Sequence, residues 1–173
     1  MIARIFATAI YEAHIARRNR WVLVAVVLRV VFSLVLAAVG SAPSGGLGAD
    51  RLSIAVASLT SLSVYLVPLM ALLMSFDAIA GEVERGTLPL LLTYPVARWE
   101  IIAGKLVAHT GILLIALIAG YGAAALVALA GDPTAVAGVS ALWRLTWTST
   151  LLGATFLGIG YGLSSLSRRA SGA

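Results

Sequence analysis

The chain of 173 residues contains no cysteine and very few charged side chains. The absence of cysteine excludes disulfides, thiolate metal sites and redox pairs. Charged residues make up 11% of the chain and hydrophobic residues 61%, whereas a soluble domain has roughly 25% charged residues. Alternating strand patterns are also missing, so the backbone has to satisfy its hydrogen bonds as helices if it crosses lipid. We therefore predict an all-α fold, a polytopic membrane helical bundle.

Recognisable catalytic motifs are absent as well. The chain has no glycine-rich phosphate loop, no paired histidines at metal spacing and no GxSxG turn. An intramembrane hydrolase would need a nucleophile facing a base, and His109 with a helix serine is the one formal option. We predict a chain without enzyme activity, metal site or bound cofactor, so that any energy source has to come from a partner.

The apolar runs predict one transmembrane domain over residues 1–173. Each run reaches the roughly 20 residues that a membrane-spanning helix requires. The first is too long for the apolar region of a cleavable signal peptide, so it stays attached. We expect four transmembrane helices, at 21–40, 52–76, 106–130 and 139–166.

Basic residues predict the orientation of these helices. Nine of the twelve lie before the first span, between the second and third, or after the fourth. The positive-inside rule therefore places both termini and the segment 77–105 in the cytoplasm. Residues 1–20 carry apolar residues at three- and four-residue spacing, which predicts an interfacial helix on the inner membrane surface. A plain extension of the first membrane helix is the alternative.

Three side chains inside the predicted spans are candidates for a transport pathway. Arg29 lies mid-span, where a cation is costly unless it reaches the headgroups or faces the interior of an assembly and meets an acid. Met70 and Met74 lie four residues apart on one helical face and could hand over a soft metal ion. Methionines at this spacing are more often adaptable packing residues.

Small residues recur at four-residue spacing in the last two spans. Such stripes allow helix backbones to approach closely, within this chain or in a second copy. The stripes are Ala116, Gly120 and Ala124, followed by Ala154, Gly158 and Gly162.

The segment 77–105 is charged and rich in turn-forming residues. Within it, Thr87 can begin a short helix that runs through Leu92 and stops at Tyr94 and Pro95. A short cytoplasmic helix with a leucine face fits a groove on a soluble protein. Its alternative is a helix that lies on lipid.

The run from Gly81 to Lys105 resembles the signature loop of ABC-2 type transporter permeases. That loop has a Gly-Glu-x-Glu-x-Gly-Thr-Leu element followed by a hydrophobic stretch, a proline and a Gly-Lys, and here the run reads GEVERGTLPLLLTYPVARWEIIAGK. With the preceding FDAI and with Asn19-Arg20-Trp21, it is most similar to the permeases that serve maturation of nitrous oxide reductase.

The resemblance implies a location in the inner membrane of a bacterium, a set of partners and a contact site. The partners are a second permease copy, a cytoplasmic nucleotide-binding ATPase that holds ATP and Mg²⁺, and a periplasmic β-helical maturation partner, with the copper centres of the reductase as the final target. The contact with the ATPase falls on Glu82, Glu84, Arg85, Gly86, Thr87 and Leu88. Permeases of the family have six spans, so the four found here predict a fragment of such a bundle.

Two other functions remain open. A permease of the same family that exports a drug, a lipid or another small molecule would share these motifs. A membrane scaffold without transport would not depend on Glu84 for coupling to an ATPase.

Overall fold

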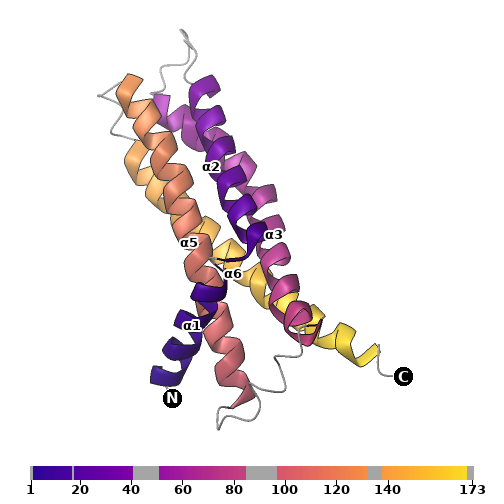
Figure 1. Cartoon of the computed structure of the whole chain (residues 1–173). Helices are drawn as coiled ribbons and strands as arrows, with labels where there is room; N and C mark the ends of the chain where they lie inside the picture. Colours follow the sequence, from indigo (N-terminus) through magenta and orange to yellow (C-terminus); the bar gives the residue numbers. More distant parts are fainter. Residues whose placement is uncertain (1, 17, 41–50, 85–96, 132–137, 171–173) are drawn as a thin grey trace.

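The fold is a bundle of long α-helices (Figure 1). The computed structural model describes residues 2–16, 18–40, 51–84, 97–131 and 138–170, and within these ranges all regular structure is helical. The predicted all-α membrane bundle is thereby confirmed. Its helices are α1 (Ile2–Ala16), α2 (Arg20–Gly40), α3 (Arg51–Glu84), α5 (Arg98–Gly131) and α6 (Gly138–Ala170).

The long helices α3, α5 and α6 run between two ends of the molecule, and α1 and α2 follow one another along α5 (Figure 1). Both termini, the end of α3 and the start of α5 lie at one end, which we call the terminal end (Figure 1). The end of α2, the start of α3, the end of α5 and the start of α6 lie at the opposite end. This arrangement puts the predicted cytoplasmic groups on one side of the bundle.

The membrane helices are longer than the apolar runs that predicted them. α3 and α5 have 34 residues each, so α3 continues through 77–84 and α5 already begins at Arg98. The segment 77–105, taken from the sequence as one loop, therefore includes two helical ends. The charged residues after position 76 end the apolar run but not the helix, because alanine and glutamate in this region have good helix propensity.

The N-terminal helix is a separate element. The amide N–H groups of Arg18 and Asn19 donate to the carbonyls of Ile15 and Ala16, at 3.0 Å each, and close a turn between α1 and α2. The chain then enters α2 at Arg20. Residues 1–20 are thus not a straight extension of the first membrane helix, and α1 packs along α5.

Among the described residues, three helices are long and apolar enough to cross a membrane, with candidate spans at Val22–Val39, Leu52–Ser75 and Trp99–Gly131. The fourth predicted crossing, 139–166, lies in α6, which has 33 residues but is not among these spans. Its mean hydropathy is lowered by Arg144 and by hydroxyl side chains. Several of these hydroxyls, including Thr146, Ser149 and Thr150, are buried in the bundle. A crossing by α6 stays a prediction.

The apolar core lies where α3 packs on α6 and α2 packs on α5. Leu59, Leu113 and Leu117 are fully buried there. The predicted stripe on α5 is part of this contact: Ala116, Gly120 and Ala124 are buried, and Gly120 faces Ser33 of α2. A β-carbon at Gly120 would lie 3.0 Å from Ser33 Oγ, so the two backbones approach closely.

The predicted stripe on α6 is on the wrong face for contacts within this chain. Gly158 and Gly162 are exposed, and a β-carbon at either would meet no atom within 4 Å. The glycines that bring α6 close to its neighbours are Gly153, which faces Leu113, and Gly160, which faces Ser75. The two glycines of each pair have a helical spacing, so the spacing alone does not distinguish one face of α6 from the other. The positions of α3 and α5 decide which face is buried.

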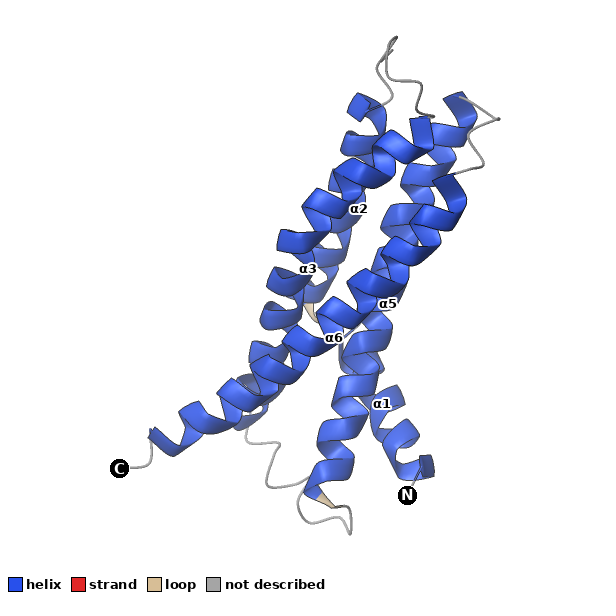
Figure 2. Ribbon diagram, turned by 180° about the vertical axis from the view of Figure 1, so that it is seen from behind, coloured by secondary structure: helices blue, strands red, loops and turns tan. Residues whose placement is uncertain are grey.

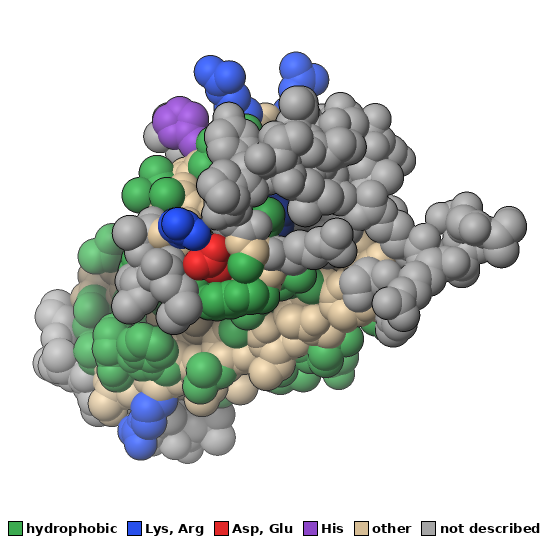
Figure 3. All heavy atoms as spheres, turned by 90° about the horizontal axis from the view of Figure 1, so that it is seen from below, with side chains coloured by type: hydrophobic (Ala, Val, Ile, Leu, Met, Phe, Trp, Pro, Cys, Tyr) green, Lys and Arg blue, Asp and Glu red, His purple; other side chains and the backbone are tan. Residues whose placement is uncertain are grey.

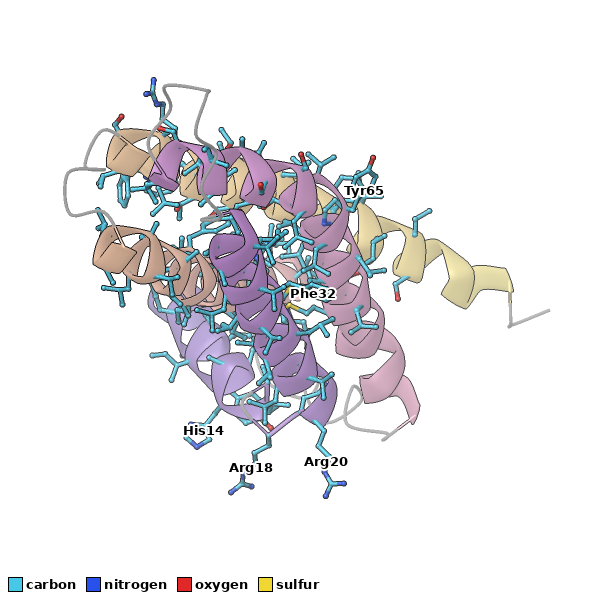
Figure 4. The ribbon with its side chains drawn as sticks, turned by 90° about the horizontal axis from the view of Figure 1, so that it is seen from above. His14, Arg18, Arg20, Phe32 and Tyr65 are labelled. Atoms are coloured by element: carbon cyan, nitrogen blue, oxygen red, sulfur yellow. The ribbon has the colours of Figure 1, made fainter. Side chains whose placement is uncertain are left out.

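Apolar side chains cover the outside of the bundle. Phe32 of α2 and Tyr65 of α3 are 43% and 79% exposed and point away from the helices, as Figure 4 shows. His14, Arg18 and Arg20 point outward near the α1–α2 turn (Figure 4). Viewed from the terminal end, basic and acidic side chains appear side by side among apolar ones (Figure 3). An apolar belt with charges at one end suits a protein in a bilayer.

Candidate functional site

Arg29 lies at the centre of the bundle. Its side chain is 0% exposed, although it belongs to the middle of α2. The guanidinium Cζ lies 4.7 Å from the centroid of the Tyr121 ring of α5, and Nη2 donates to Ser63 Oγ of α3 at 2.9 Å. The cation therefore faces the interior and is held by two neighbouring helices.

Hydroxyl groups link three helices around this guanidinium. Ser63 Oγ and the Tyr121 hydroxyl are 2.6 Å apart, and the Tyr121 hydroxyl lies 2.8 Å from Ser149 Oγ of α6. Ser63 Oγ also donates to the carbonyl oxygen of Leu59. We call Arg29, Ser33, Ser63, Tyr121 and Ser149 the Arg29 cluster. It is a buried polar group that joins α2, α3, α5 and α6.

This placement decides between two expectations for Arg29. A guanidinium that reached the inner headgroups would be exposed near a helix end, whereas this one is enclosed. The expected acid partner is not found among the side chains that the structure describes, where the ion pairs involve Arg4 and Lys105. A role of Arg29 in a pathway stays a prediction.

Met70 and Met74 lie in apolar parts of the bundle. Both are nearly fully buried on α3, Met70 in the main core and Met74 beside Val22 and Leu157. Met70 is seven residues from Ser63, which corresponds to about 10 Å along a helix. The methionines thus occupy packing positions away from the Arg29 cluster. Within the described ranges no group of His, Cys, Asp and Glu side chains could hold a metal ion.

A buried ion pair fixes α1 to α5. Lys105 Nζ of α5 donates to Glu12 Oε1 of α1 at 2.5 Å, and both side chains are about 95% buried, at 5% and 6% exposed. Next to this pair, Gly104 faces Thr8, and a β-carbon there would lie 2.6 Å from Thr8 Cβ. The N-terminal helix is therefore anchored by charge and by close backbone contact. The spacing of the apolar residues in 1–20 did not predict this contact between α1 and α5.

The beginning of α5 carries two further polar contacts. Glu100 accepts a hydrogen bond from the amide of Ala97 at 3.1 Å, in the manner of a helix N-terminal cap, and lies 4.0 Å from Arg4 Nη1 of α1. His109 Nδ1 is hydrogen-bonded to the Tyr161 hydroxyl of α6. His109 is thus a buried packing residue with a polar partner, as expected for a lone histidine.

The predicted ATPase contact is only partly within the described chain. Glu82 and Glu84 belong to the last turn of α3, at the terminal end. Arg85, Gly86, Thr87 and Leu88, and the short helix predicted after them, lie outside the described residues. The structure accordingly places the two flanking helix ends and leaves the contact itself a prediction.

Two arms extend toward the terminal end. One consists of α1 with the first part of α5, and the other of the last parts of α3 and α6; both ribbon views show them diverging (Figures 1 and 2). The His109–Tyr161 hydrogen bond joins α5 to α6 before they separate. The signature segment connects one arm to the other, because it follows α3 and precedes α5.

Comparison with known proteins identifies the family. Residues 6–173 match the model of the ABC-2 family transporter proteins. The chain belongs to this family. It is 44% identical over 158 residues to a "Probable ABC transporter permease protein NosY" of Pseudomonas aeruginosa, covering 90% of this chain and 58% of that protein. It is 46% identical over 149 residues to the protein of the same name from Stutzerimonas stutzeri, covering 85% of this chain and 54% of the relative.

Family membership gives the broad class of the protein. It is a multi-pass membrane protein of the ABC-2 permease family. The chain spans a little more than half the length of the two relatives.

Proposed function

We propose that this chain is the permease part of an ABC transporter in which the α3–α5 connection receives the force of ATP binding and hydrolysis from a cytoplasmic ATPase. Glu82, Glu84, Arg85, Gly86, Thr87 and Leu88 make that contact. The transporter serves maturation of the copper centres of nitrous oxide reductase, together with a second permease copy and a periplasmic β-helical partner. ATP and Mg²⁺ bind to the ATPase and not to this chain.

The position of the signature segment carries the proposal. The helix ends that flank it, the end of α3 and the start of α5, lie at the terminal end and belong to different arms. A partner bound there holds the ends of α3 and α5, so its closure moves the arms relative to each other. The ion pair between Glu12 and Lys105 makes α1 move with α5.

The reductase function rests on similarity. The signature segment resembles that of the maturation permeases, and two relatives named NosY are 44% and 46% identical. A general ABC-2 exporter and a scaffold without transport are the alternatives, and each predicts a different outcome in the following experiment.

The test is to express the full-length permease with its neighbouring ATPase and compare the wild type with a Glu82→Ala, Glu84→Ala, Leu88→Asp variant. We expect the variant to lose the ATPase during purification while its helical content is unchanged. The matched control carries Ser140→Ala, Arg144→Gln and Thr148→Ala, three exposed positions of α6 near the opposite end. It should retain the ATPase.

A second readout is the copper content of nitrous oxide reductase purified from the same cells. We expect the variant to yield copper-deficient enzyme and the control to yield loaded enzyme. Equal recovery of the ATPase by both proteins would contradict the coupling contact and favour the scaffold. Lost ATPase with fully loaded reductase would contradict the maturation role and favour a general exporter.

A further inference from the structure

The Arg29 cluster contains more hydrogen-bond donors than acceptors. Arg29 Nε, Arg29 Nη1 and Ser33 Oγ are buried without a hydrogen-bond partner among the described residues. Arg29 and Ser33 are one helical turn apart on α2, and both lie against Gly120 of α5. A guanidinium has only donors, and buried donors are normally paired.

The hydrogen bonds of the neighbouring hydroxyls run toward Ser63 and the Leu59 carbonyl and leave these three atoms unpaired. Each hydroxyl has one proton and two lone pairs. Because Ser63 donates to the Leu59 carbonyl, its oxygen accepts from both Arg29 Nη2 and the Tyr121 hydroxyl. Tyr121 in turn accepts from Ser149. The hydrogen bonds of these hydroxyls therefore point away from the unpaired nitrogens of Arg29. Both lone pairs of Ser63 Oγ are already used.

The charge of Arg29 is also uncompensated within the described chain. The ion pairs among the described side chains link Arg4 to Glu100 and Lys105 to Glu12. Stacking on Tyr121 and one hydroxyl acceptor offset only part of the cost of placing a cation in an apolar interior. An acceptor that carries negative charge would pair with these donors and offset the charge of the guanidinium at the same time.

We propose that Arg29 and Ser33 bind one compact monovalent anion of about halide size inside the bundle. The charge follows from the cluster, which holds a single cation, so that a divalent anion would leave a buried net negative charge. The size follows from Gly120, where even a β-carbon would lie 3.0 Å from Ser33 Oγ. A polyatomic oxyanion needs the helices to separate, whereas a single-atom anion needs a smaller displacement of the serine hydroxyl.

This site goes beyond the proposed coupling to an ATPase and does not depend on it. The anion completes the contact between α2, α3 and α5, and its binding can be measured without nucleotide. Failure of the ATPase experiment would leave the anion site untouched, and the reverse also holds.

The test uses full-length permease in lipid nanodiscs, prepared in sodium gluconate and titrated with chloride at constant ionic strength. Ligand that binds the folded state raises Tm in a saturable way. We expect a rise of about 2–4 °C for the wild type, with sulfate giving little change. Equilibrium binding of radioactive chloride should give one ion per chain.

Arg29→Gln should abolish the response to chloride and, in gluconate, should unfold at or above the wild-type temperature, because the unpaired charge is gone. Ser33→Ala keeps the cation and should weaken the apparent affinity on the order of tenfold. Arg144→Gln, an exposed arginine of α6, should respond as the wild type does.

Three results would overturn the proposal. They are a wild type without a saturable response, an equal response in Arg29→Gln, and a structure of the full-length protein with a carboxylate from another segment or a second copy bound to Arg29. If Arg29→Gln did not fold, an unchanged affinity in Ser33→Ala would have the same meaning.

Discussion

Replacing Lys105 by methionine destabilises the protein by about 3–5 kcal/mol, because it leaves the Glu12 carboxylate buried without its counter-ion. The two side chains are 5% and 6% exposed, so water cannot replace the lost partner in the folded state. We expect α1 to separate from α5 first, since Glu12 is the buried charge by which α1 is held there. Unfolding in mixed detergent micelles, followed by circular dichroism, measures the loss.

The control for this prediction is the double variant Glu12→Leu with Lys105→Met. Removal of both charges avoids the unpaired carboxylate and should restore most of the stability, since a buried ion pair is often no better than apolar packing. Arg4→Met breaks only a 4.0 Å contact of a side chain that is 58% exposed, and the buried Glu100 keeps its hydrogen bond from the Ala97 amide. The change should therefore cost less than about 1 kcal/mol. A double variant as unstable as Lys105→Met would show that the ion pair is not the cause.

The second large effect concerns Gly160 on α6. A leucine there should cost up to about 3 kcal/mol through overpacking. A β-carbon at this position would lie 2.0 Å from Ser75 Oγ and 2.7 Å from Ser75 Cβ of α3. The hydroxyl can rotate away, but Ser75 Cβ can move only with its backbone, so α3 and α6 have to separate.

Gly158 provides a matched control two residues away. A β-carbon at Gly158 meets no atom within 4 Å. Gly158→Leu should therefore be neutral or stabilising, because leucine is a better helix former than glycine. Thermal unfolding of the two variants distinguishes the faces of α6. Similar destabilisation by both would contradict the contact between α3 and α6 described here.

The sequence predicted the helical class, and three of the four predicted crossings overlap candidate membrane spans, because lipid imposes simple requirements on both. A backbone in hydrocarbon must satisfy its own hydrogen bonds, and about 20 apolar residues are needed to span it. Those requirements do not determine where a helix ends in water. The ends of α3 and α5 therefore extend into 77–84 and 98–105, beyond the apolar runs.

Side-chain partners were much harder to predict than helices. After Arg20, α2 is apolar all round apart from Arg29 and Ser33, so no periodicity shows which face is inside. The partner of Arg29 is Ser63, 34 residues away, and the partner of Lys105 is Glu12, 93 residues away. The pair of Glu12 and Lys105 could have been suggested by two signals, a glutamate within the apolar helix α1 and a lysine near the start of the apolar helix α5. The stripe of Gly158 and Gly162 does not pack within this chain, because helical spacing alone does not identify the packed face, and its contact with a second copy stays a prediction.

The central claim is that nucleotide binding by the ATPase moves the two arms relative to each other. These 173 residues contain no cysteine, so within them spin labels attach only to cysteines that are introduced in pairs. Ile102 of α5 and Leu163 of α6 are 51% and 57% exposed, one on each arm. Leu126 of α5 and Val139 of α6, which are 72% and 43% exposed near the opposite end, form the reference pair.

The decisive measurement is the distance between each pair of labels, by pulsed electron paramagnetic resonance, in the full-length complex with its ATPase. We predict that a non-hydrolysable ATP analogue shifts the Ile102–Leu163 distance distribution and changes the Leu126–Val139 distribution less or in the opposite direction. The Glu82→Ala, Glu84→Ala, Leu88→Asp variant should show no shift. Identical Ile102–Leu163 distributions with and without the analogue, in a complex that retains its ATPase, would contradict the claim.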